Sequence, residues 1–227
     1  MSANQVLIFD MDGVLVDVSD SYRETIQRTV EHFTGRPITR PQIQDYKNQG
    51  GWNDDWALST HIIREFGKDV EYQSVVDYFQ LIFHGNGSDG LILQERWIAA
   101  EGLFERLARR FQLAIFTGRL RWEAELTLRR FAPEIRFAPI VGAGDIERLK
   151  PAPDGLLKIH ALSQPARAWY IGDTVDDARS ARAANLPFIG IAAPENPRYR
   201  ELVALFEAEK SVAILDDINQ LETALAL

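Results

Sequence analysis

Residues 6–14 constrain the fold of this chain more than any other segment. They begin with a continuous apolar run, which is the pattern of a strand buried on both faces. The run ends in two carboxylates one residue apart, Asp10 and Asp12, and then Gly13. In an extended segment the two side chains point the same way, and two like charges that close need a cation or a proton. The pattern therefore indicates either a divalent-metal or acid–base site at a strand end, or a plain strand followed by an Asp-Gly turn.

The composition narrows the class of protein. A chain of 227 residues, 46% hydrophobic and 26% charged, suits a globular protein with one large domain or a core with an insertion. The absence of cysteine excludes a disulfide scaffold, a cysteine zinc site and a cysteine nucleophile. The net charge of −8 and the lack of a basic cluster argue against a nucleic-acid partner. No apolar run is long enough to cross a bilayer and residues 1–4 leave no room for a signal peptide, so we expect a cytoplasmic protein without membrane attachment.

The second half of the chain alternates between strand and helix patterns. Strands are predicted at residues 112–116, 137–141, 168–171, 188–191 and 212–215, and helices at 99–110, 122–131, 153–162, 177–184, 199–209 and 218–226. Such alternation is typical of an α/β fold, a doubly wound and mostly parallel sheet with helices on both faces. The strand at residues 6–9 belongs to the same sheet.

Residues 18–90 have a different pattern, with helical spacing and little strand signal. We interpret them as a helical cap domain, inserted into a core domain formed by residues 1–17 and 91–227. The expected linkers lie near residues 14–18 and 84–97, and the second is rich in glycine, as a hinge can be.

Polar groups follow three of the predicted strands. Asp10 and Asp12 follow the first, Thr117 and Arg119 follow residues 112–116, and Asp173 and Asp177 follow residues 168–171; Lys150 stands in a loop before a helix. Taken singly, each has a plain structural explanation as a turn, an exposed lysine or a helix cap. Ligand chemistry in an open α/β sheet lies beyond the carboxyl ends of the strands, so their coincidence on one edge predicts a site there.

The set and order of these motifs resemble the haloacid dehalogenase (HAD) superfamily across nearly the whole chain. The matching motifs are Asp10-Met11-Asp12-Gly13-Val14, Thr117-Gly118-Arg119, Lys150-Pro151 and Gly172-Asp173-Thr174-Val175-Asp176-Asp177. A helical insertion directly after the first motif is similar to the subfamily with a C1-type cap, which includes phosphoglycolate phosphatase and β-phosphoglucomutase. The resemblance implies a Rossmann-like core and dependence on Mg²⁺.

The resemblance also implies a role for each matching residue. Asp10 is the expected nucleophile, which forms an aspartyl-phosphate. The expected Mg²⁺ ligands are the Asp10 carboxylate, the Asp12 backbone carbonyl and Asp173, while Asp177 binds or orients metal waters. Asp176 is the neighbouring alternative to Asp177.

Proton transfer and phosphate binding fall to the remaining motif residues. Asp12 matches the general acid and base of the family, a residue that its dehalogenases lack. Thr117 and the backbone N–H groups near Gly118 are expected to bind the phosphate, and the Lys150 ammonium is expected to hold both the nucleophile and the phosphate. Arg119 is not a general family residue, and it either reaches the phosphate or substrate or forms a surface pair with an acidic neighbour.

The cap is expected to choose the substrate through a loop that touches the leaving group. The candidate loop contains Gly51 and Trp52, although Trp52 and Trp56 also have the spacing of core residues. Asp54 and Asp55 either select an amine or cap a helix.

Together these observations predict a phosphatase that hydrolyses a small phosphorylated metabolite. The alternatives are a phosphomutase of the same fold and a non-catalytic binding or regulatory module. Candidate substrates include phosphoglycolate, a sugar phosphate and an amino-alcohol phosphate such as histidinol phosphate.

Overall fold

A computed structural model describes residues 5–226. Its contacts divide the chain into two compact units. The core unit contains the chain up to Val16 and from Trp97 onward, and the helical unit is Asp17–Arg96. No helix within residues 5–226 is both long and apolar enough to cross a membrane.

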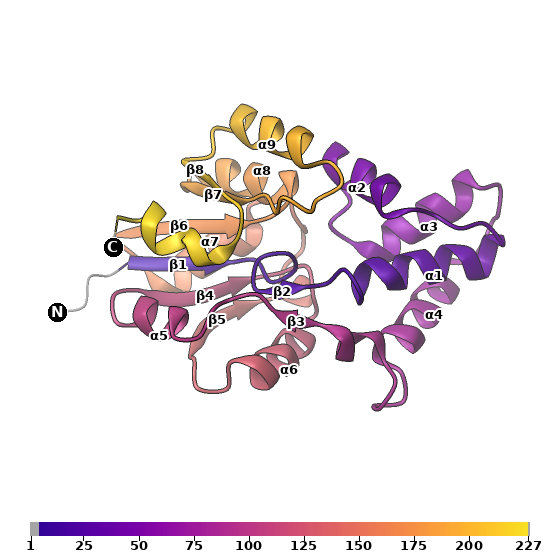
Figure 1. The fold of residues 1–227 in the computed structure, drawn as a ribbon, viewed down its shortest axis with the longest axis horizontal. Coiled ribbons are helices and arrows are strands. Elements are labelled where there is room, and N and C mark those ends of the chain that lie inside the picture. Colours follow the sequence, from indigo (N-terminus) through magenta and orange to yellow (C-terminus); the bar gives the residue numbers. More distant parts are fainter. Residues whose placement is uncertain (1–4, 227) are drawn as a thin grey trace. The chain divides into compact units, whose positions relative to one another are not determined.

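The core unit is built on a six-stranded sheet with the order β5-β4-β1-β6-β7-β8 (Figure 1). The strands are β1 (Gln5–Phe9), β4 (Gln112–Phe116), β5 (Phe137–Val141), β6 (Arg167–Gly172), β7 (Phe188–Ile191) and β8 (Ala213–Leu215). All neighbouring pairs run parallel. In the centre, Phe9 of β1 pairs with Ile115 of β4 and with Ile171 of β6. The doubly wound parallel sheet predicted from the sequence is confirmed.

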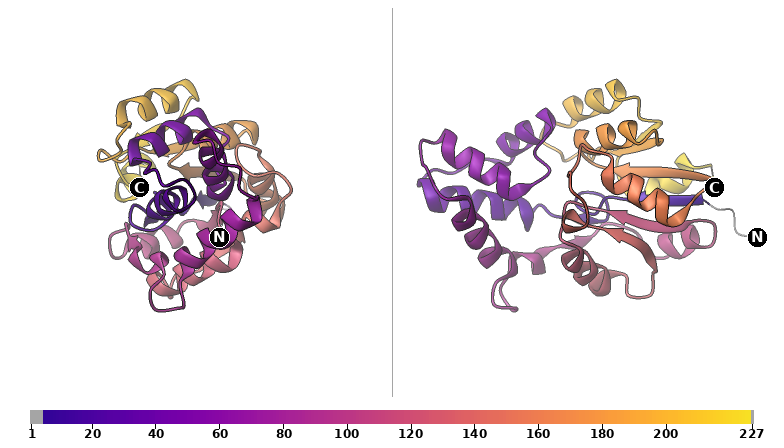
Figure 2. Two further views of the ribbon diagram at one scale, coloured as in Figure 1. Left: turned by 90° about the vertical axis from the view of Figure 1, so that its right-hand side faces the viewer. Right: turned by 180° about the vertical axis from the view of Figure 1, so that it is seen from behind.

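Helices cover both faces of this sheet, as Figure 2 shows. They are α5 (Leu103–Ala108), α6 (Arg121–Phe131), α7 (Asp154–Ser163), α8 (Val175–Ala183), α9 (Tyr199–Ala208) and α10 (Leu221–Ala224). Ile8 belongs to a buried cluster that includes Ile159 of α7 and Phe206 of α9. The next residue, Phe9, contacts the ring of Phe104 in α5 at a centroid distance of 5.5 Å. Successive residues of β1 thus enter opposite layers, which is why the strand is apolar throughout.

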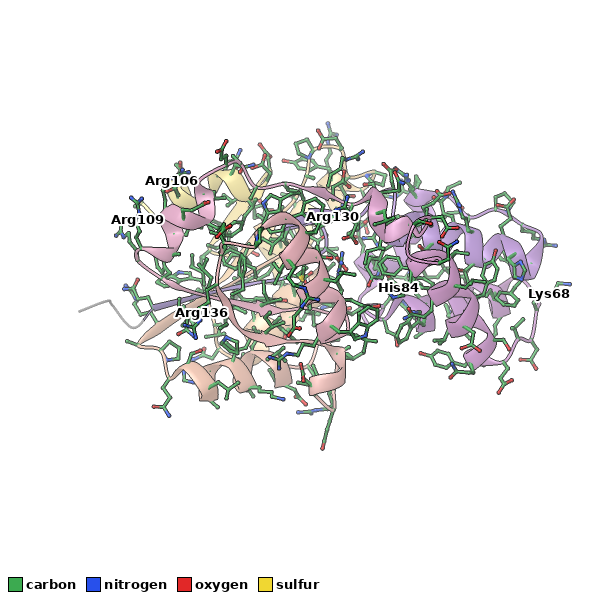
Figure 3. The ribbon with its side chains drawn as sticks, turned by 90° about the horizontal axis from the view of Figure 1, so that it is seen from below. Lys68, His84, Arg106, Arg109, Arg130 and Arg136 are labelled. Atoms are coloured by element: carbon green, nitrogen blue, oxygen red, sulfur yellow. The ribbon has the colours of Figure 1, made fainter. Side chains whose placement is uncertain are left out.

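Two helices of the core unit are shorter than the sequence pattern predicts. The expected helix at 99–110 begins only at Leu103, because Gly102 has a φ of +81° that a helix interior does not accept. The expected helix at 218–226 is a 3₁₀ turn, η3 (Ile218–Gln220), followed by α10. Arg106 of α5, labelled in Figure 3, joins these two regions through an ion pair of 2.8 Å with Glu222.

The helical unit consists of α1 (Tyr22–Thr34), α2 (Arg40–Gln49), α3 (Asp55–Glu65), α4 (Tyr72–His84) and the 3₁₀ turn η1 (Leu91–Gln94). Helix α1 packs against α3 and α4. Its core contains fully buried side chains such as Ile26, Ile62 and Phe79. Helix α3 begins at an Asp54 N-cap, whose carboxylate accepts hydrogen bonds from the next turn, so Asp54 has the capping role.

The segments at the unit boundary form a small sheet of their own. Strands β2 (Val16–Asp17) and β3 (Arg96–Trp97) pair with each other, and each is too short to give a sequence signal. The second boundary lies beyond the expected residue 90, because η1 packs against α1 and α4 and buries Leu91.

Candidate active site

The strand ends that carry polar groups are neighbours in the sheet. β4, β1 and β6 lie side by side and run parallel, so the residues that follow them share one edge. Asp10 follows β1 directly, and its backbone N–H donates to Ile171 of β6 at 2.8 Å. Thr117 follows β4 and Asp173 follows β6. Topology therefore brings together residues more than a hundred positions apart in the chain.

Lys150 lies between two carboxylates at this edge. Its Nζ is 2.8 Å from Asp10 Oδ1 and 2.8 Å from Asp177 Oδ1. All three residues are buried, and Nζ also lies 4.9 Å from the centre of the Phe116 ring. A cation held this way offsets part of the repulsion between the carboxylates, which are costly to bury unpaired.

Asp177 is held by further contacts with the protein. Its Oδ1 accepts a hydrogen bond of 2.6 Å from the Tyr170 hydroxyl. Its Oδ2 accepts from the backbone N–H and the hydroxyl of Thr174, at 3.0 and 2.6 Å. These contacts form the capping box that starts α8, so the carboxylate is fixed in place by the start of a helix.

Three carboxylates lie close enough to hold one metal ion. Asp10, Asp173 and Asp177 each offer an oxygen, and these oxygens lie within 4.8 Å of one another. An all-oxygen set of this kind fits Mg²⁺ by its chemistry. Asp177, rather than its neighbour Asp176, belongs to this group.

The burial of these charges changes their protonation. Burial raises the pKa of Asp10 to about 7; Lys150 opposes this rise, while Asp177 and Asp12 add to it. For Asp177, burial alone would also raise the pKa, but the contact with Lys150 and the hydrogen bonds from Thr174 and Tyr170 together lower it. The pKa of Lys150 is raised, because attraction to Asp10 and Asp177 outweighs the effect of burial. A bound divalent cation would favour the ionised form of Asp10.

The Asp12 side chain has a different partner from that of Asp10. Strand β1 ends at Phe9, and residue 12 lies in the tight turn that follows. Asp12 Oδ1 accepts hydrogen bonds from Nε and Nη2 of Arg119, at 2.7 and 2.5 Å. Arg119 thus pairs with an acidic neighbour, but the expectation of a surface pair is wrong, since its side chain is fully buried. Its Nη1 donates to the Thr127 hydroxyl at 2.9 Å.

Thr117 is buried, and its hydroxyl oxygen accepts a hydrogen bond of 3.2 Å from the backbone N–H of Arg119. That bond forms a tight turn around Gly118, the residue between them. The Thr117 hydroxyl keeps its own proton, with which it can donate.

The cap candidates have well-defined surroundings within the helical unit. Gly51 has a φ of +82°, which glycine adopts without strain. The ring centroids of Trp52 and His61 lie 4.4 Å apart. The backbone carbonyl of Trp52 accepts a hydrogen bond from the Lys47 ammonium. Lys47 also pairs with Asp55, so this carboxylate already has a cationic partner.

Tyr170 and Thr127 contact the candidate catalytic groups, yet sequence reasoning did not find them. Tyr170 fits the apolar pattern of β6, and Thr127 lies at an ordinary position within α6. Only the tertiary contacts with Asp177 and Arg119 reveal them.

The family is established by comparison with known proteins. Residues 7–191 match the model of the haloacid dehalogenase-like hydrolases. The chain belongs to this family of hydrolases, and the resemblance predicted from its motifs is confirmed, including the similarity to phosphoglycolate phosphatases.

Several curated relatives are matched over only part of their length. The chain is 32% identical over 200 residues to an imidazoleglycerol-phosphate dehydratase of Phytophthora nicotianae, covering 84% of this chain and 44% of that protein. It is 32% identical over 93 residues to a phosphoglycolate phosphatase of Salmonella typhi, covering 40% of this chain and 35% of that protein. The chain thus spans less than half the length of these two relatives.

Other matches extend over nearly the whole chain. The pyrophosphatase PpaX of Anoxybacillus flavithermus is 23% identical over 225 residues, covering 96% of each chain. The solved structure of phosphatase Tt82 from Thermococcus thioreducens has a TM-score of 0.63 at 26% identity, covering 88% of this chain and 98% of that one. A phosphonoacetaldehyde hydrolase-like protein from Oleispira antarctica has a TM-score of 0.76 at 14% identity, over 98% of this chain and 91% of that one, which shows a shared fold.

Proposed function

We propose that this chain is a Mg²⁺-dependent phosphatase that hydrolyses a small phosphate ester through an aspartyl-phosphate on Asp10. The observation that carries the proposal is the position of Asp10, buried beside Lys150 and within reach of two further carboxylates. A carboxylate can attack an anionic phosphate only if positive charge offsets the repulsion between them. Lys150 supplies part of that charge.

The metal ion would supply the rest of the charge by cancelling repulsion between the phosphate and the carboxylates. Asp10, Asp173 and the backbone carbonyl of Asp12 would hold it. Asp177 has both oxygens engaged by Lys150, Tyr170 and Thr174, which suits a residue that orients the site.

The proposed reaction has two steps. In the first, the Asp10 carboxylate attacks phosphorus, the bond to the leaving oxygen breaks, and Asp12 donates a proton to that oxygen. In the second, Asp12 takes a proton from a water molecule that attacks the aspartyl-phosphate, which releases phosphate and restores Asp10. Thr117, the N–H of Gly118 and Lys150 would hold the phosphoryl oxygens during both steps.

We assign substrate selection to the helical unit, as a C1-type cap in which Gly51 and Trp52 contact the leaving group. Phosphorylated small molecules appear in the names of several relatives: phosphoglycolate, pyrophosphate and imidazoleglycerol phosphate. An imidazole-bearing ester such as histidinol phosphate therefore belongs with the first two in a substrate test.

The test is a screen for phosphate release from these compounds and from sugar phosphates, with Mg²⁺ and with EDTA. We expect the wild type to release phosphate from at least one compound only with Mg²⁺, and Asp10→Asn to release none. Equal activity of the two proteins would exclude Asp10 as the nucleophile. Isomerised sugar phosphate without phosphate release would indicate a phosphomutase, and tight binding of a compound without turnover would indicate a binding module.

A further inference from the structure

Arg119 is the largest fully buried side chain of the described residues, and all three of its side-chain nitrogens have polar partners. Nε and Nη2 donate to Asp12, and Nη1 donates to Thr127 of α6. Removing a guanidinium from water is costly, so its placement here needs a strong partner. That partner is the residue to which we assign proton transfer.

The backbone of Arg119 is fixed as firmly as its side chain. Its N–H donates to the Thr117 hydroxyl oxygen at 3.2 Å, and its carbonyl accepts from the N–H of Ala143 at 2.9 Å. The backbone of Arg119 is thereby fixed in the loop after β4 and against η2 (Ala143–Asp145), while its guanidinium is held on α6 through Thr127. An arginine restrained at both ends restricts the position of any group it binds.

The contact with Asp12 uses only one of its two oxygens. A fork-shaped pair would occupy both carboxylate oxygens, but here both nitrogens donate to Oδ1. Within residues 5–226 the structure gives Oδ2 no hydrogen bond, and the side chain of Asp12 is 29% exposed. The arrangement fixes the carboxylate while leaving one oxygen available.

We propose that Arg119 is a positioning residue that holds Asp12 Oδ1, so that Oδ2 is aimed at the oxygen that accepts or gives up the proton. This inference rests on the proposed function, because it concerns the two proton transfers of that reaction. Thr127 takes part indirectly by fixing the guanidinium.

The leaving group provides a direct test. An alkoxide leaving group needs a proton as it departs, whereas p-nitrophenolate departs readily without one. The ratio kcat/KM reports the steps up to release of the leaving group. Loss of positioning should therefore lower kcat/KM for an alkyl phosphate much more than for p-nitrophenyl phosphate.

The experiment compares Arg119→Met with the wild type on these two substrates. We expect kcat/KM to fall about 100-fold for the alkyl ester and less than about 10-fold for the aryl ester. Because hydrolysis of the aspartyl-phosphate still needs Asp12 as a base, we also expect a burst of p-nitrophenolate followed by slow turnover. If Arg119 only stabilised the fold, the substitution would lower kcat/KM equally for the alkyl and the aryl ester and would give no burst of p-nitrophenolate.

Two further variants keep the test decisive. Thr127→Val removes the hydrogen bond between Nη1 and the Thr127 hydroxyl without removing a charge. It should shift the ratio of the two kcat/KM values in the same direction by about 3-fold. Arg106→Met removes another arginine of the core unit that pairs with a carboxylate, Glu222, and it should leave that ratio unchanged.

Equal losses on both substrates for Arg119→Met, or an unchanged ratio for a folded Thr127→Val, would overturn the inference while leaving the phosphatase proposal intact. A wild type that hydrolyses neither ester, nor any compound of the screen, would instead overturn the proposed function.

Discussion

The carboxylate of Asp173 lies directly against the backbone of Gly13, in the turn that follows β1. A Cβ atom on residue 13 would lie 2.0 Å from Asp173 Oδ2, far inside the closest contact that atoms make. Gly13 also has a φ of +75°, a conformation that strains other residues. The glycine of the first motif is thus needed so that the first and fourth motifs can approach each other.

Gly13→Ala should therefore weaken Mg²⁺ binding by at least about 10-fold, because Asp173 must move away from the new methyl group. Isothermal titration calorimetry on the metal-free protein measures this. The matched control is Gly35→Ala in the helical unit, where φ is +68° and nothing lies within 4 Å of the new Cβ. It should cost about 1 kcal/mol of stability but leave metal affinity unchanged. Equal metal affinity in both variants would contradict the steric argument.

Tyr170→Phe should destabilise the protein by about 1.5–3 kcal/mol, the usual value of a hydrogen bond to a charged group. Burial raises the pKa of the Tyr170 hydroxyl well above its ordinary value, so the hydroxyl stays a donor to Asp177. Urea unfolding of the metal-free protein gives the free energy. As the control, Tyr72→Phe removes an exposed hydroxyl 3.4 Å from Asp54 and should change stability by less than about 0.5 kcal/mol. Similar effects of the two substitutions would argue against a buried Tyr170–Asp177 bond.

Binding of Mg²⁺ should weaken as the pH falls through about 7, the pKa to which burial raises Asp10. A proton and the metal ion compete for the same carboxylate, so the apparent dissociation constant should be about 10-fold higher at pH 6 than at pH 8. Calorimetric titrations at the two pH values test this. In Asp10→Asn the difference should disappear, and a wild type with equal affinity at both pH values would refute the prediction.

The raised pKa of Asp10 should also make the metal-free protein less stable as the pH rises, whereas metal affinity should increase. The folded-state pKa of Asp10 lies above its ordinary value of 3.8, so the folded, metal-free protein binds more protons than the unfolded chain between these values. The contribution of Asp10 to stability is therefore greatest below pH 3.8 and is lost as the pH rises to about 7. Measured by urea unfolding between pH 5 and pH 7, the stability of the wild type relative to Asp10→Asn should decrease. An increase would mean that Lys150 outweighs burial at Asp10.

Much of the core unit could be predicted from the sequence, because strands buried on both faces read as continuous apolar runs such as residues 6–9. Because parallel strands end at the same edge of a sheet, the sequence also predicted that Asp10, Thr117 and Asp173 lie on one edge. The order of the strands was not predicted and comes from the structure. The start of α5 could not be predicted in the same way, because the apolar spacing continues upstream while Gly102 takes a left-handed conformation.

The contacts of individual site residues were harder to predict. Asp12, which accepts from Arg119, lies 107 residues away in the chain. The residues that flank Arg119 in the sequence do not indicate which carboxylate it binds. In the sequence, Tyr170 cannot be distinguished from the other residues of a buried strand. The role of its hydroxyl becomes visible only in the structure, where it donates a hydrogen bond to Asp177. The fourth motif left Asp176 as an alternative to Asp177, and the structure distinguishes them: Asp177 joins Asp10 and Asp173, and it closes the capping box with Thr174 at the start of α8.

Asp12→Asn and Asp173→Asn should separate proton transfer from metal binding. The Asp12 side chain binds Arg119 and is not part of the group formed by Asp10, Asp173 and Asp177, so Asp12→Asn should keep its Mg²⁺ affinity within about 3-fold. Its turnover of an alkyl phosphate should nevertheless fall by about 10²–10⁴-fold, the usual contribution of a general acid and base. Asp173→Asn should instead lose Mg²⁺ affinity by at least about 10-fold. Calorimetry and phosphate release on both variants test this, and a loss of metal affinity in Asp12→Asn equal to that in Asp173→Asn would show that the Asp12 carboxylate itself binds the metal.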